Sequence, residues 1–251
     1  MPPLPLPQSL ALPPALVAVL QRRGVQSQEE LQSLLQPDPA PEAKAHFPDL
    51  EIAVQRLLQA CREGQALAVC GDYDADGMTS TALLVGVLSR LGAKPQAAIP
   101  SRQSEGYGLN AAMVERLAEQ GVKLLVTVDN GISAREALER AEGLGLEVIV
   151  TDHHTIPPQR PPLLALLHPA LTPPRSPSRG FAGVGLAYVL AAAVAERLRN
   201  PQALRTALDL FCIGTIADMA PLTGVDRRGL HEGLAQLHRS LLPGLGAVAA
   251  L

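Results

Sequence analysis

The central part of the chain alternates short runs of consecutive apolar residues with longer segments whose apolar residues recur at helical spacing. The strand candidates are 66–70, 96–99, 123–128 and 147–151, and the helix candidates are 79–91, 110–120 and 133–141. Continuous apolar runs are typical of strands that are buried on both faces. This alternation predicts an α/β fold with a mostly parallel sheet and helices on both faces.

The first fifty residues show a different, helical pattern. One short helix is expected at roughly 9–22, and a second starts at Ser27, where Glu30 three residues later completes a capping box. A proline-rich stretch at 37–41 interrupts the chain, and a helix then fits Leu50 to Arg62. We therefore expect a short helical N-terminal region, 1–50, ahead of a main domain.

The pattern changes again after the last predicted strand. Residues 155–180 are rich in proline, with one apolar island at 163–167 that is a candidate for a further strand. Two strongly helical stretches follow, and a last helix is expected to start near Asp226; the two stretches are 183–199 and 201–219. These boundaries predict a main domain over 51–225, followed in 226–251 by the start of a helix that leads towards a C-terminal part outside this chain.

Composition narrows the class of protein. The chain has 251 residues, of which 47% are hydrophobic and 18% charged, a balance typical of globular proteins. The formal net charge of −3 argues weakly against nucleic acid, unless bound cations offset acidic residues. Three widely spaced cysteines indicate neither a disulfide framework nor a CxxC metal site. The sequence has neither a long uncharged apolar run nor the basic start of a signal peptide, so we expect a cytoplasmic protein with no membrane partner.

Acidic residues stand directly after three of the predicted strands. Asp72 opens an acidic group behind the first strand, Asp129 follows the third, and Asp152 follows the fourth. The carboxyl ends of parallel strands lie on one edge of the sheet, so these distant segments are predicted to converge there. An aspartate after a strand is also a common helix cap or turn former, and Asp129-Asn130-Gly131 taken alone has the form of a turn.

Converging carboxylates repel one another unless a positive charge lies among them, which indicates a metal site. Asp72, Asp74 and Asp76 share the parity of an extended chain, so all three are predicted to point into the same crevice. His153 and His154 follow the fourth strand, and neighbours in an extended backbone point apart. One is expected to bind metal while the other faces a substrate phosphate; the alternative is an ordinary surface pair. Five or more ligands fit a two-metal site of the kind that hydrolyses phosphoryl groups.

Four segments together resemble the motifs of a known superfamily. GDYDADG, VTVDNG, TDHH and GTIADMAPL are similar to the four motifs of the DHH phosphoesterases. Three more segments resemble segments of the RecJ family, which belongs to this superfamily. They are Ile99-Pro100-Ser101-Arg102 with Glu105 to Leu109, Phe181 to Gly185, and His46 to Leu50. The resemblance covers roughly residues 25–230 and identifies the main domain as a DHH catalytic domain.

The resemblance implies two divalent metal ions, with Mn²⁺ expected and Mg²⁺ as the second choice. Carried over by motif, the implied metal ligands are Asp74, Asp76, Asp129, His153 and Asp218, with Asp129 as the bridge. His154 is implied to contact the scissile phosphate, while Asp72 and Asp152 orient ligands or water. The implied substrate-binding residues are Arg102, Tyr107, Gly183 and Gly185. Tyr107 either stacks a base or packs its own loop.

The implied activity is that of a single-stranded-DNA-specific 5′→3′ exonuclease that releases mononucleotides during DNA recombination and repair. Its partners would be single-stranded DNA with a 5′ end, a single-strand-binding protein and a helicase. The chain departs from the family in two ways: Cys70 stands where many relatives have histidine, and the family's downstream DHHA1 and OB-like domains are expected to lie outside this chain. Cys70 either faces the site as a soft ligand or points into the core.

Two other functions remain open at this point. The chain could be a different DHH phosphoesterase that hydrolyses oligoribonucleotides, cyclic dinucleotides or pyrophosphate. It could also be a non-catalytic scaffold with this fold, although such proteins lose motif carboxylates and all four motifs are present here.

Overall fold

A five-stranded parallel sheet forms the centre of the molecule. The computed structural model describes residues 12–37 and 42–249, and within them the strand order is β2-β1-β3-β4-β5. The strands are β1 Ala66–Cys70, β2 Lys94–Ala98, β3 Leu124–Val128, β4 Glu147–Thr151 and β5 Ala165–Leu167. All pairings are parallel, which confirms the predicted α/β fold.

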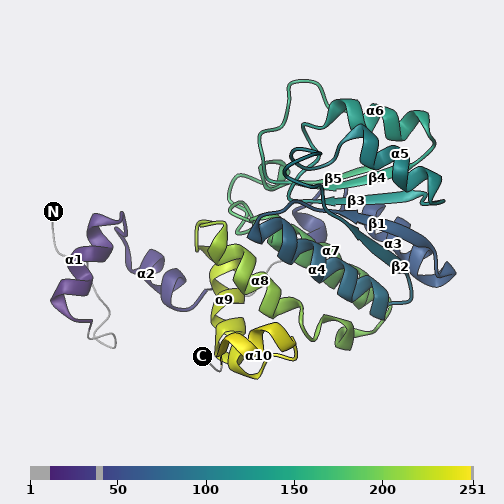
Figure 1. The fold of residues 1–251 in the computed structure, drawn as a ribbon. Helices are drawn as coiled ribbons and strands as arrows, with labels where there is room; N and C mark the ends of the chain where they lie inside the picture. Colours follow the sequence, from purple (N-terminus) through teal and green to yellow (C-terminus); the bar gives the residue numbers. More distant parts are fainter. Residues whose placement is uncertain (1–11, 38–41, 250–251) are drawn as a thin grey trace.

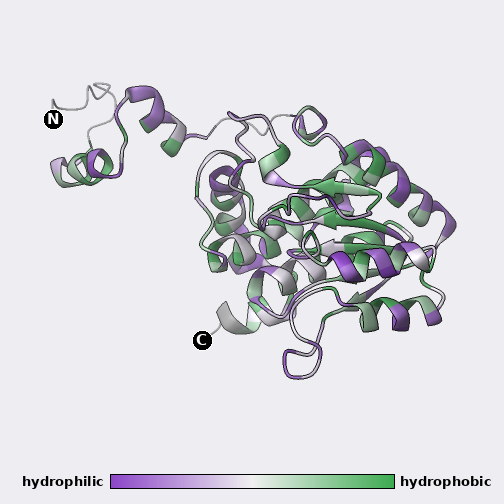
Figure 2. Cartoon of the chain, turned by 90° about the horizontal axis from the view of Figure 1, so that it is seen from above, coloured by the Kyte–Doolittle hydropathy of each residue, from purple (hydrophilic) through white to green (hydrophobic). Residues whose placement is uncertain are grey.

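Helices cover both faces of this sheet, as Figure 1 shows. The helices α5 (Ala111–Glu119) and α6 (Arg135–Gly143) lie on one face, and α3 (Leu50–Glu63), α4 (Ala75–Arg90) and α7 (Gly183–Arg197) lie on the other. Alternate strand residues divide between two hydrophobic clusters, one on each face. The strands are accordingly hydrophobic while the outer helix surfaces are polar (Figure 2). The strand β2 is the exception to the predicted burial on both faces, because it forms one edge and only its Ala98 is buried.

The helix α4 begins earlier than the sequence pattern predicts. It starts at Ala75 rather than at 79, because the Asp74 side chain accepts a hydrogen bond from the backbone N–H of Gly77 and caps the helix. Asp74 and Asp76 therefore lie at the cap and in the first helical turn. The argument from extended-chain parity was wrong, although the carboxylates still reach a common site.

The predicted helix over 201–219 is in fact two elements. A short 3-10 helix, Pro201–Leu204, precedes α8, Ala207–Ala217. The guanidinium of Arg90 lies at the break, where it donates to the Ala203 carbonyl and to the Thr206 hydroxyl. Arg90 thus supplies a hydrogen-bond donor to the Ala203 carbonyl at this break. The candidate strand at 163–167 is confirmed as β5, and the chain ends in α9 (Gly224–Gln236), a 3-10 turn (Leu237–Arg239) and α10 (Pro243–Ala249).

The N-terminal helices lie beside the main body (Figures 1 and 2). The helix α1 runs from Pro14 to Arg22, later than the predicted start at 9, although residues 9–11 lie outside the described residues. The helix α2, Gln28–Leu35, begins with the predicted capping box, which the structure confirms. Arg227 of α9 donates to the Leu34 carbonyl and joins this region to the body. The predicted break at 37–41 lies mostly outside the described residues, and the domain boundaries at 50 and 225 stay predictions.

The segment from His46 to Leu50 closes the β5 edge of the sheet. The Asp49 carboxylate accepts hydrogen bonds from the backbone N–H of Leu166 in β5 and from Arg160. The Phe47 ring stacks on Phe181 with 6.4 Å between centroids. An otherwise free strand edge is therefore covered by the chain itself. None of the helices in the described part of the chain is long and apolar enough to cross a membrane.

Candidate metal centre and active site

The predicted convergence of acidic residues occurs at the carboxyl edge of the sheet. The segments behind β1, β3 and β4 meet there, and Asp218 joins them from the end of α8. Three groups of side chains each bring their ligand atoms within 4.8 Å of one another, and they are Asp76-His153-Asp218, Asp72-Asp74-Asp129 and Asp129-His153-His154. Because Asp129 and His153 each belong to two groups, the three groups form one continuous cluster.

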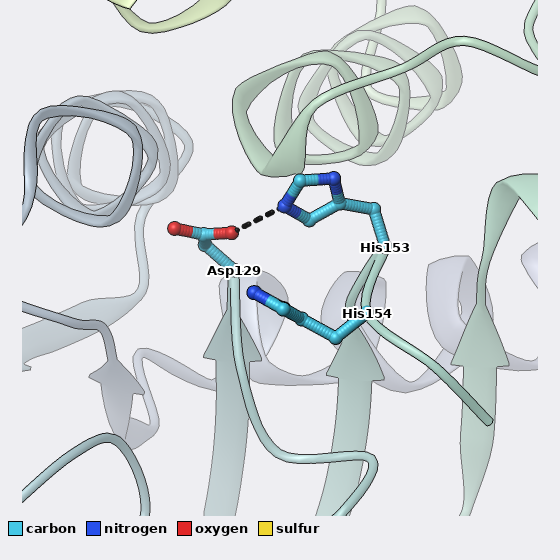
Figure 3. Close-up of side chains that lie close together, drawn as sticks. All are labelled: Asp129, His153 and His154. Carbon is cyan, nitrogen blue, oxygen red and sulfur yellow. Dashed lines mark ion pairs between the residues drawn. The ribbon is translucent and has the colours of Figure 1, made fainter. Parts of the chain in front are cut away.

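Asp129 lies at the middle of this cluster. Its Oδ1 is 2.9 Å from His153 Nε2, so the ends of the neighbouring strands β3 and β4 are joined by an ion pair (Figure 3). Burial raises the pKa of Asp129 to about 7, against the lowering effect of His153. Burial alone would lower the pKa of His153, but the contact with Asp129 outweighs it and raises that pKa to about 9.

Asp76 is the buried carboxylate of the first motif. It accepts hydrogen bonds from the backbone N–H groups of Gly183, at 2.6 Å, and Val184, at 2.8 Å, which lie at the start of α7. Burial raises the pKa of Asp76 while these two bonds lower it, and the net direction is upward. A carboxylate at a helix N-terminus is electrostatically favourable, so Asp76 is fixed in place by α7.

Gly183 and Gly185, in the segment from Phe181 to Gly185, serve close packing. A Cβ on Gly183 would lie 2.6 Å from the Cβ of Asp129, and a Cβ on Gly185 would lie 2.8 Å from the ring of Phe181. Both glycines are buried. The absence of a side chain at Gly183 lets the start of α7 approach Asp129 and Asp76. Direct contact of either glycine with substrate stays a prediction.

One carboxylate oxygen in the cluster is buried without any partner, and a second has only one charged partner. Asp72 Oδ2 has no partner, while the other Asp72 oxygen accepts the backbone N–H of Asp74 at 3.1 Å. Asp129 Oδ1 has only the ion pair with His153. Buried charged oxygens are normally paired or bound to metal, because an unpaired buried charge costs several kcal/mol. A divalent cation supplies the missing partner, so the residues present fit a metal site built from oxygen and imidazole ligands.

Asp152 holds His154 rather than extending the carboxylate cluster. Its Oδ1 accepts from the backbone N–H of His154 at 2.9 Å and from the ring Nδ1 at 2.8 Å, and its Oδ2 accepts from the backbone N–H of Ile132 at 2.9 Å. Burial alone would raise the pKa of Asp152, but these bonds outweigh it and lower the pKa. Hydrogen bonding to Asp152 is the main cause that raises the pKa of His154. The geometry agrees with the orienting role that the resemblance implies.

Asp218 reaches the cluster from a helix rather than from a strand end, as the C-terminal cap of α8. It is half-buried, and burial raises the pKa of its carboxyl, opposed by His153. Its neighbour Met219 has a left-handed backbone with φ of 57° and is 85% exposed. The residue pattern of α8 does not mark Asp218 as a site residue, which the motif resemblance alone had indicated.

Aromatic residues and one arginine form the rim next to His154. The Tyr107 hydroxyl donates to the Asp129 carbonyl at 3.2 Å and lies 3.4 Å from His154 Nε2. The Tyr73 ring meets the Tyr107 ring edge-on, and the Arg102 guanidinium lies 5.3 Å from the Tyr73 centroid. Tyr107 is 51% exposed and borders a cavity of about 270 Å³ that His154 and Asp152 also line. Arg102 and Tyr107 are therefore at the mouth of the site.

Sequence reasoning missed two residues of this site, Tyr73 and Asn130. The Asn130 amide donates to the carbonyls of Cys70 and Val128 and accepts from the backbone N–H of Leu109, so it ties β1, β3 and the Tyr107 loop together. The sequence does place Asn130 in an Asp-Asn-Gly segment directly after a buried strand, but a turn explains that pattern equally well. Tyr73 had no signal beyond its place between two aspartates.

The structure also decides the position of Cys70. It is fully buried in the hydrophobic cluster under α5 and α6, and burial raises the pKa of its thiol to about 12. A thiol in that environment stays protonated and packs as a small apolar side chain. The candidate ligands that converge at the site are therefore carboxylates and imidazoles.

Comparisons with known proteins agree with this geometry. The model of the DHH family, N-terminal domain, matches residues 66–215. The single-stranded-DNA-specific exonuclease RecJ of Escherichia coli is 37% identical over 254 residues, and that of Thermus thermophilus is 43% identical over 229 residues. These alignments cover 94% and 90% of this chain, but only 43% and 32% of the relatives. The chain thus spans less than half the length of these curated relatives.

Solved structures show the same likeness. The crystal structure of exonuclease RecJ bound to manganese aligns with a TM-score of 0.75 at 43% identity, covering 84% of this chain and 53% of that one. RecJ from Thermus thermophilus in complex with Mn²⁺ aligns with a TM-score of 0.75 at 36% identity, covering 98% and 37%.

Proposed function

The chain belongs to the DHH family, and we propose that it is the catalytic part of a divalent-metal-dependent exonuclease that degrades single-stranded DNA from the 5′ end. The observation that carries the proposal is the continuous carboxylate–imidazole cluster around Asp129, in which the buried Asp72 Oδ2 lacks a partner. The names of the relatives, single-stranded-DNA-specific exonucleases, support the substrate class.

We assign two metal ions to the cluster. Asp76, His153 and Asp218 would hold one, Asp74 would hold the other, and Asp129 would lie between them. The oxygen and nitrogen donors suit Mn²⁺ or Mg²⁺, and relatives have been crystallised with both ions. Such a pair supplies a water of lowered pKa and neutralises phosphate charge. Asp72 is proposed to orient a ligand or water, because its Oδ2 is buried without a partner beside Asp74 and Asp129.

The protein's own side chains bind and orient the phosphate. The Nδ1–H of His154 is held by Asp152, so its Nε2 is the atom free to donate a hydrogen bond to a phosphate oxygen. The raised pKa of His154, caused mainly by Asp152, favours the protonated donor form. Arg102 adds a second positive charge at the rim, and Tyr107 offers an exposed ring to a base.

The test is Mn²⁺-dependent digestion of 5′- and 3′-end-labelled single-stranded DNA, with Asp129→Ala as the inactive variant. We expect early release of labelled mononucleotide from the 5′-labelled strand only. Hydrolysis of short RNA or pyrophosphate, but not of single-stranded DNA, would favour another activity of the DHH family. If calorimetry detects no Mn²⁺ binding, and Asp129→Ala changes nothing, the chain is a non-catalytic scaffold.

The wider biological setting also remains part of the proposal. A role in recombination and repair, a single-strand-binding protein and a helicase as partners, and a cytoplasmic location all follow from the family resemblance alone. We further propose that the downstream domains of longer relatives add DNA contacts and raise activity.

A further inference from the structure

We propose that His168, a residue outside the DHH motifs, positions His154 by holding its backbone carbonyl. This inference rests on the proposed function, because it concerns the residue that we assign to the phosphate. His168 stands directly after β5, so β5 is the fourth strand whose carboxyl end is followed by a polar residue of the site, after β1, β3 and β4.

The two ring nitrogens of His168 make different hydrogen bonds. Its Nε2 is 2.6 Å from the carbonyl oxygen of His154, and its Nδ1 is 3.0 Å from the backbone nitrogen of Ala170. The residue is only 3% exposed. Both contacts are to main-chain atoms, so the ring joins the segment behind β4 to the turn behind β5.

These partners determine the tautomer. A carbonyl oxygen only accepts, so Nε2 must carry the hydrogen; a backbone N–H only donates, so Nδ1 must be bare. The neutral Nε2–H form satisfies both bonds, whereas a protonated ring would lose the bond from Ala170. Burial, the largest influence on its pKa, lowers that value and so favours the neutral ring.

His154 is consequently held at three points. Asp152 accepts from its backbone N–H and from its ring Nδ1, and His168 donates to its carbonyl. With these groups fixed, the ring Nε2 is left directed towards the Tyr107 hydroxyl and the mouth of the site. The Ser133 hydroxyl reaches the next carbonyl, of Thr155, at a long 3.5 Å, so His168 makes the shorter bond on this side of the loop. Removing it would leave a carbonyl unpaired and let the peptide after His154 rotate.

The test compares two substitutions with a matched control. His168→Leu replaces the ring with an apolar side chain of similar bulk and removes both bonds, and His168→Gln restores an amide donor near the position of Nε2. His46→Leu is the control, because half-buried His46 also forms one side-chain hydrogen bond, 2.6 Å from Ser176 Oγ, away from the metal centre. Thermal unfolding shows whether the three variants lose comparable stability.

Kinetics on 5′-labelled single-stranded DNA supply the decisive reading. We expect kcat of His168→Leu to fall about 10- to 100-fold, the usual cost of losing a residue that orients an active-site group. KM and Mn²⁺ affinity should change by less than about threefold, because the ligands themselves remain. His168→Gln should recover most of the loss, and His46→Leu should keep the parent kcat. A full kcat in His168→Leu, or an equal loss in His168→Gln, would overturn the positioning role.

A second measurement separates this inference from the proposed activity. Nitrogen-15 NMR of the histidine rings should show a bare Nδ1 and a protonated Nε2 at His168, and His168→Leu should shift the ring and amide signals of His154 but not of His46. This outcome is expected even if the protein does not cleave DNA. The opposite tautomer, or unchanged His154 signals, would refute the inference whether or not the enzyme is active.

Discussion

Asp152 behind β4 and His168 behind β5 have hydrogen-bond partners for all their side-chain polar atoms, whereas Asp72 behind β1 and Asp129 behind β3 are less completely paired. Each Asp152 oxygen accepts at least one hydrogen bond, and its pKa is lowered despite burial. Asp72 Oδ2 is equally buried but has no partner, and Asp129 Oδ1 has only the ion pair with His153. Burial raises the pKa of Asp129 to about 7. One side of the site is therefore complete in the protein alone, and the other is arranged to receive a cation.

This difference assigns the residues to two tasks. Carboxylates that are buried without donors gain most from a metal ion, since the ion relieves both their desolvation and their mutual repulsion. A carboxylate whose oxygens already accept backbone and imidazole hydrogen bonds gains less, and instead fixes the group that it binds. Substitutions on the two sides should therefore fail in different ways.

The largest expected difference is between Asp129→Asn and Asp152→Asn. Asparagine tolerates the left-handed backbone of residue 129, which has φ of 61°, so this change removes charge with little strain. We expect Mn²⁺ affinity measured by calorimetry to fall by more than about 100-fold in Asp129→Asn, while Asp152→Asn keeps affinity within roughly tenfold but loses about 10- to 100-fold in kcat.

The two variants should also differ in metal-free stability. Asp129→Asn breaks the ion pair with His153, but the raised pKa of Asp129 shows that burial and the charge of Asp76 outweigh that pair. Its melting temperature without metal should therefore fall less than that of Asp152→Asn. Asp152→Asn breaks an arrangement of three accepted hydrogen bonds, so its melting temperature should fall. Equal loss of Mn²⁺ affinity in both variants would contradict the division of the site into two tasks.

The edge of the sheet could be predicted because its signal is local. Apolar runs ending at Cys70, Val128 and Thr151 identify buried parallel strands, and topology then requires their following residues to meet. Asp218 was different, since an aspartate at the end of a helix has no distinctive pattern, and only the motif resemblance indicated it.

Other features depend on packing that no local pattern contains. His168 follows β5, which the sequence offered as a candidate strand, but the tautomer of His168 and its contact with His154 could not be derived from the sequence. The helix α4 starts at Ala75 because Asp74, and not another nearby polar residue, caps it. Cys70 is buried because it lies on the face of β1 that packs under α5 and α6. The alternation of residues along the strand did not show whether that face or the opposite one borders the site.

Gly183→Ala should give the next largest effect, because its added methyl group would clash with Asp129, on the side of the site that is expected to bind metal. Its new Cβ would lie 2.6 Å from the Cβ and 2.9 Å from the Cα of Asp129, which are not flexible ends of a side chain. We expect a loss of about 1–3 kcal/mol in the free energy of unfolding, together with weaker Mn²⁺ binding. Gly143→Ala, in α6 with no atom near the added Cβ, is the control and should be neutral or slightly stabilising. Unchanged Mn²⁺ affinity in a folded Gly183→Ala would refute the close-packing role.

Asp226→Asn should raise the free energy of unfolding at neutral and higher pH but not at acidic pH. Both Asp226 oxygens are buried without a partner, and burial, followed by the charge of Asp76, raises its pKa to about 8. A folded pKa above the unfolded value of about 3.9 means that stability is lost as pH rises from about 4 through 8. The variant should therefore match the parent at pH 4 and melt a few degrees higher at pH 8, as about 1 kcal/mol corresponds to roughly 2–4 °C at this size.

The control for Asp226 is another buried aspartate that has a partner. Asp209 accepts a hydrogen bond from the Ser240 hydroxyl, so Asp209→Asn should not gain stability with rising pH. A flat difference between Asp226→Asn and the parent from pH 4 to 8 would show that Asp226 has a partner in solution.

Tyr107→Phe should have the smallest effect, although Tyr107 joins the two sides of the site. Its hydroxyl donates to the Asp129 carbonyl behind β3 and lies 3.4 Å from His154 Nε2 behind β4. Loss of one such hydrogen bond costs about 0.5–1.5 kcal/mol, so kcat on 5′-labelled single-stranded DNA should fall by less than about tenfold. KM should stay unchanged because the exposed ring remains for base contact. A loss as large as that of Asp152→Asn would instead place the hydroxyl in direct contact with the reacting phosphate, and the two sides would then act through Tyr107 as one unit.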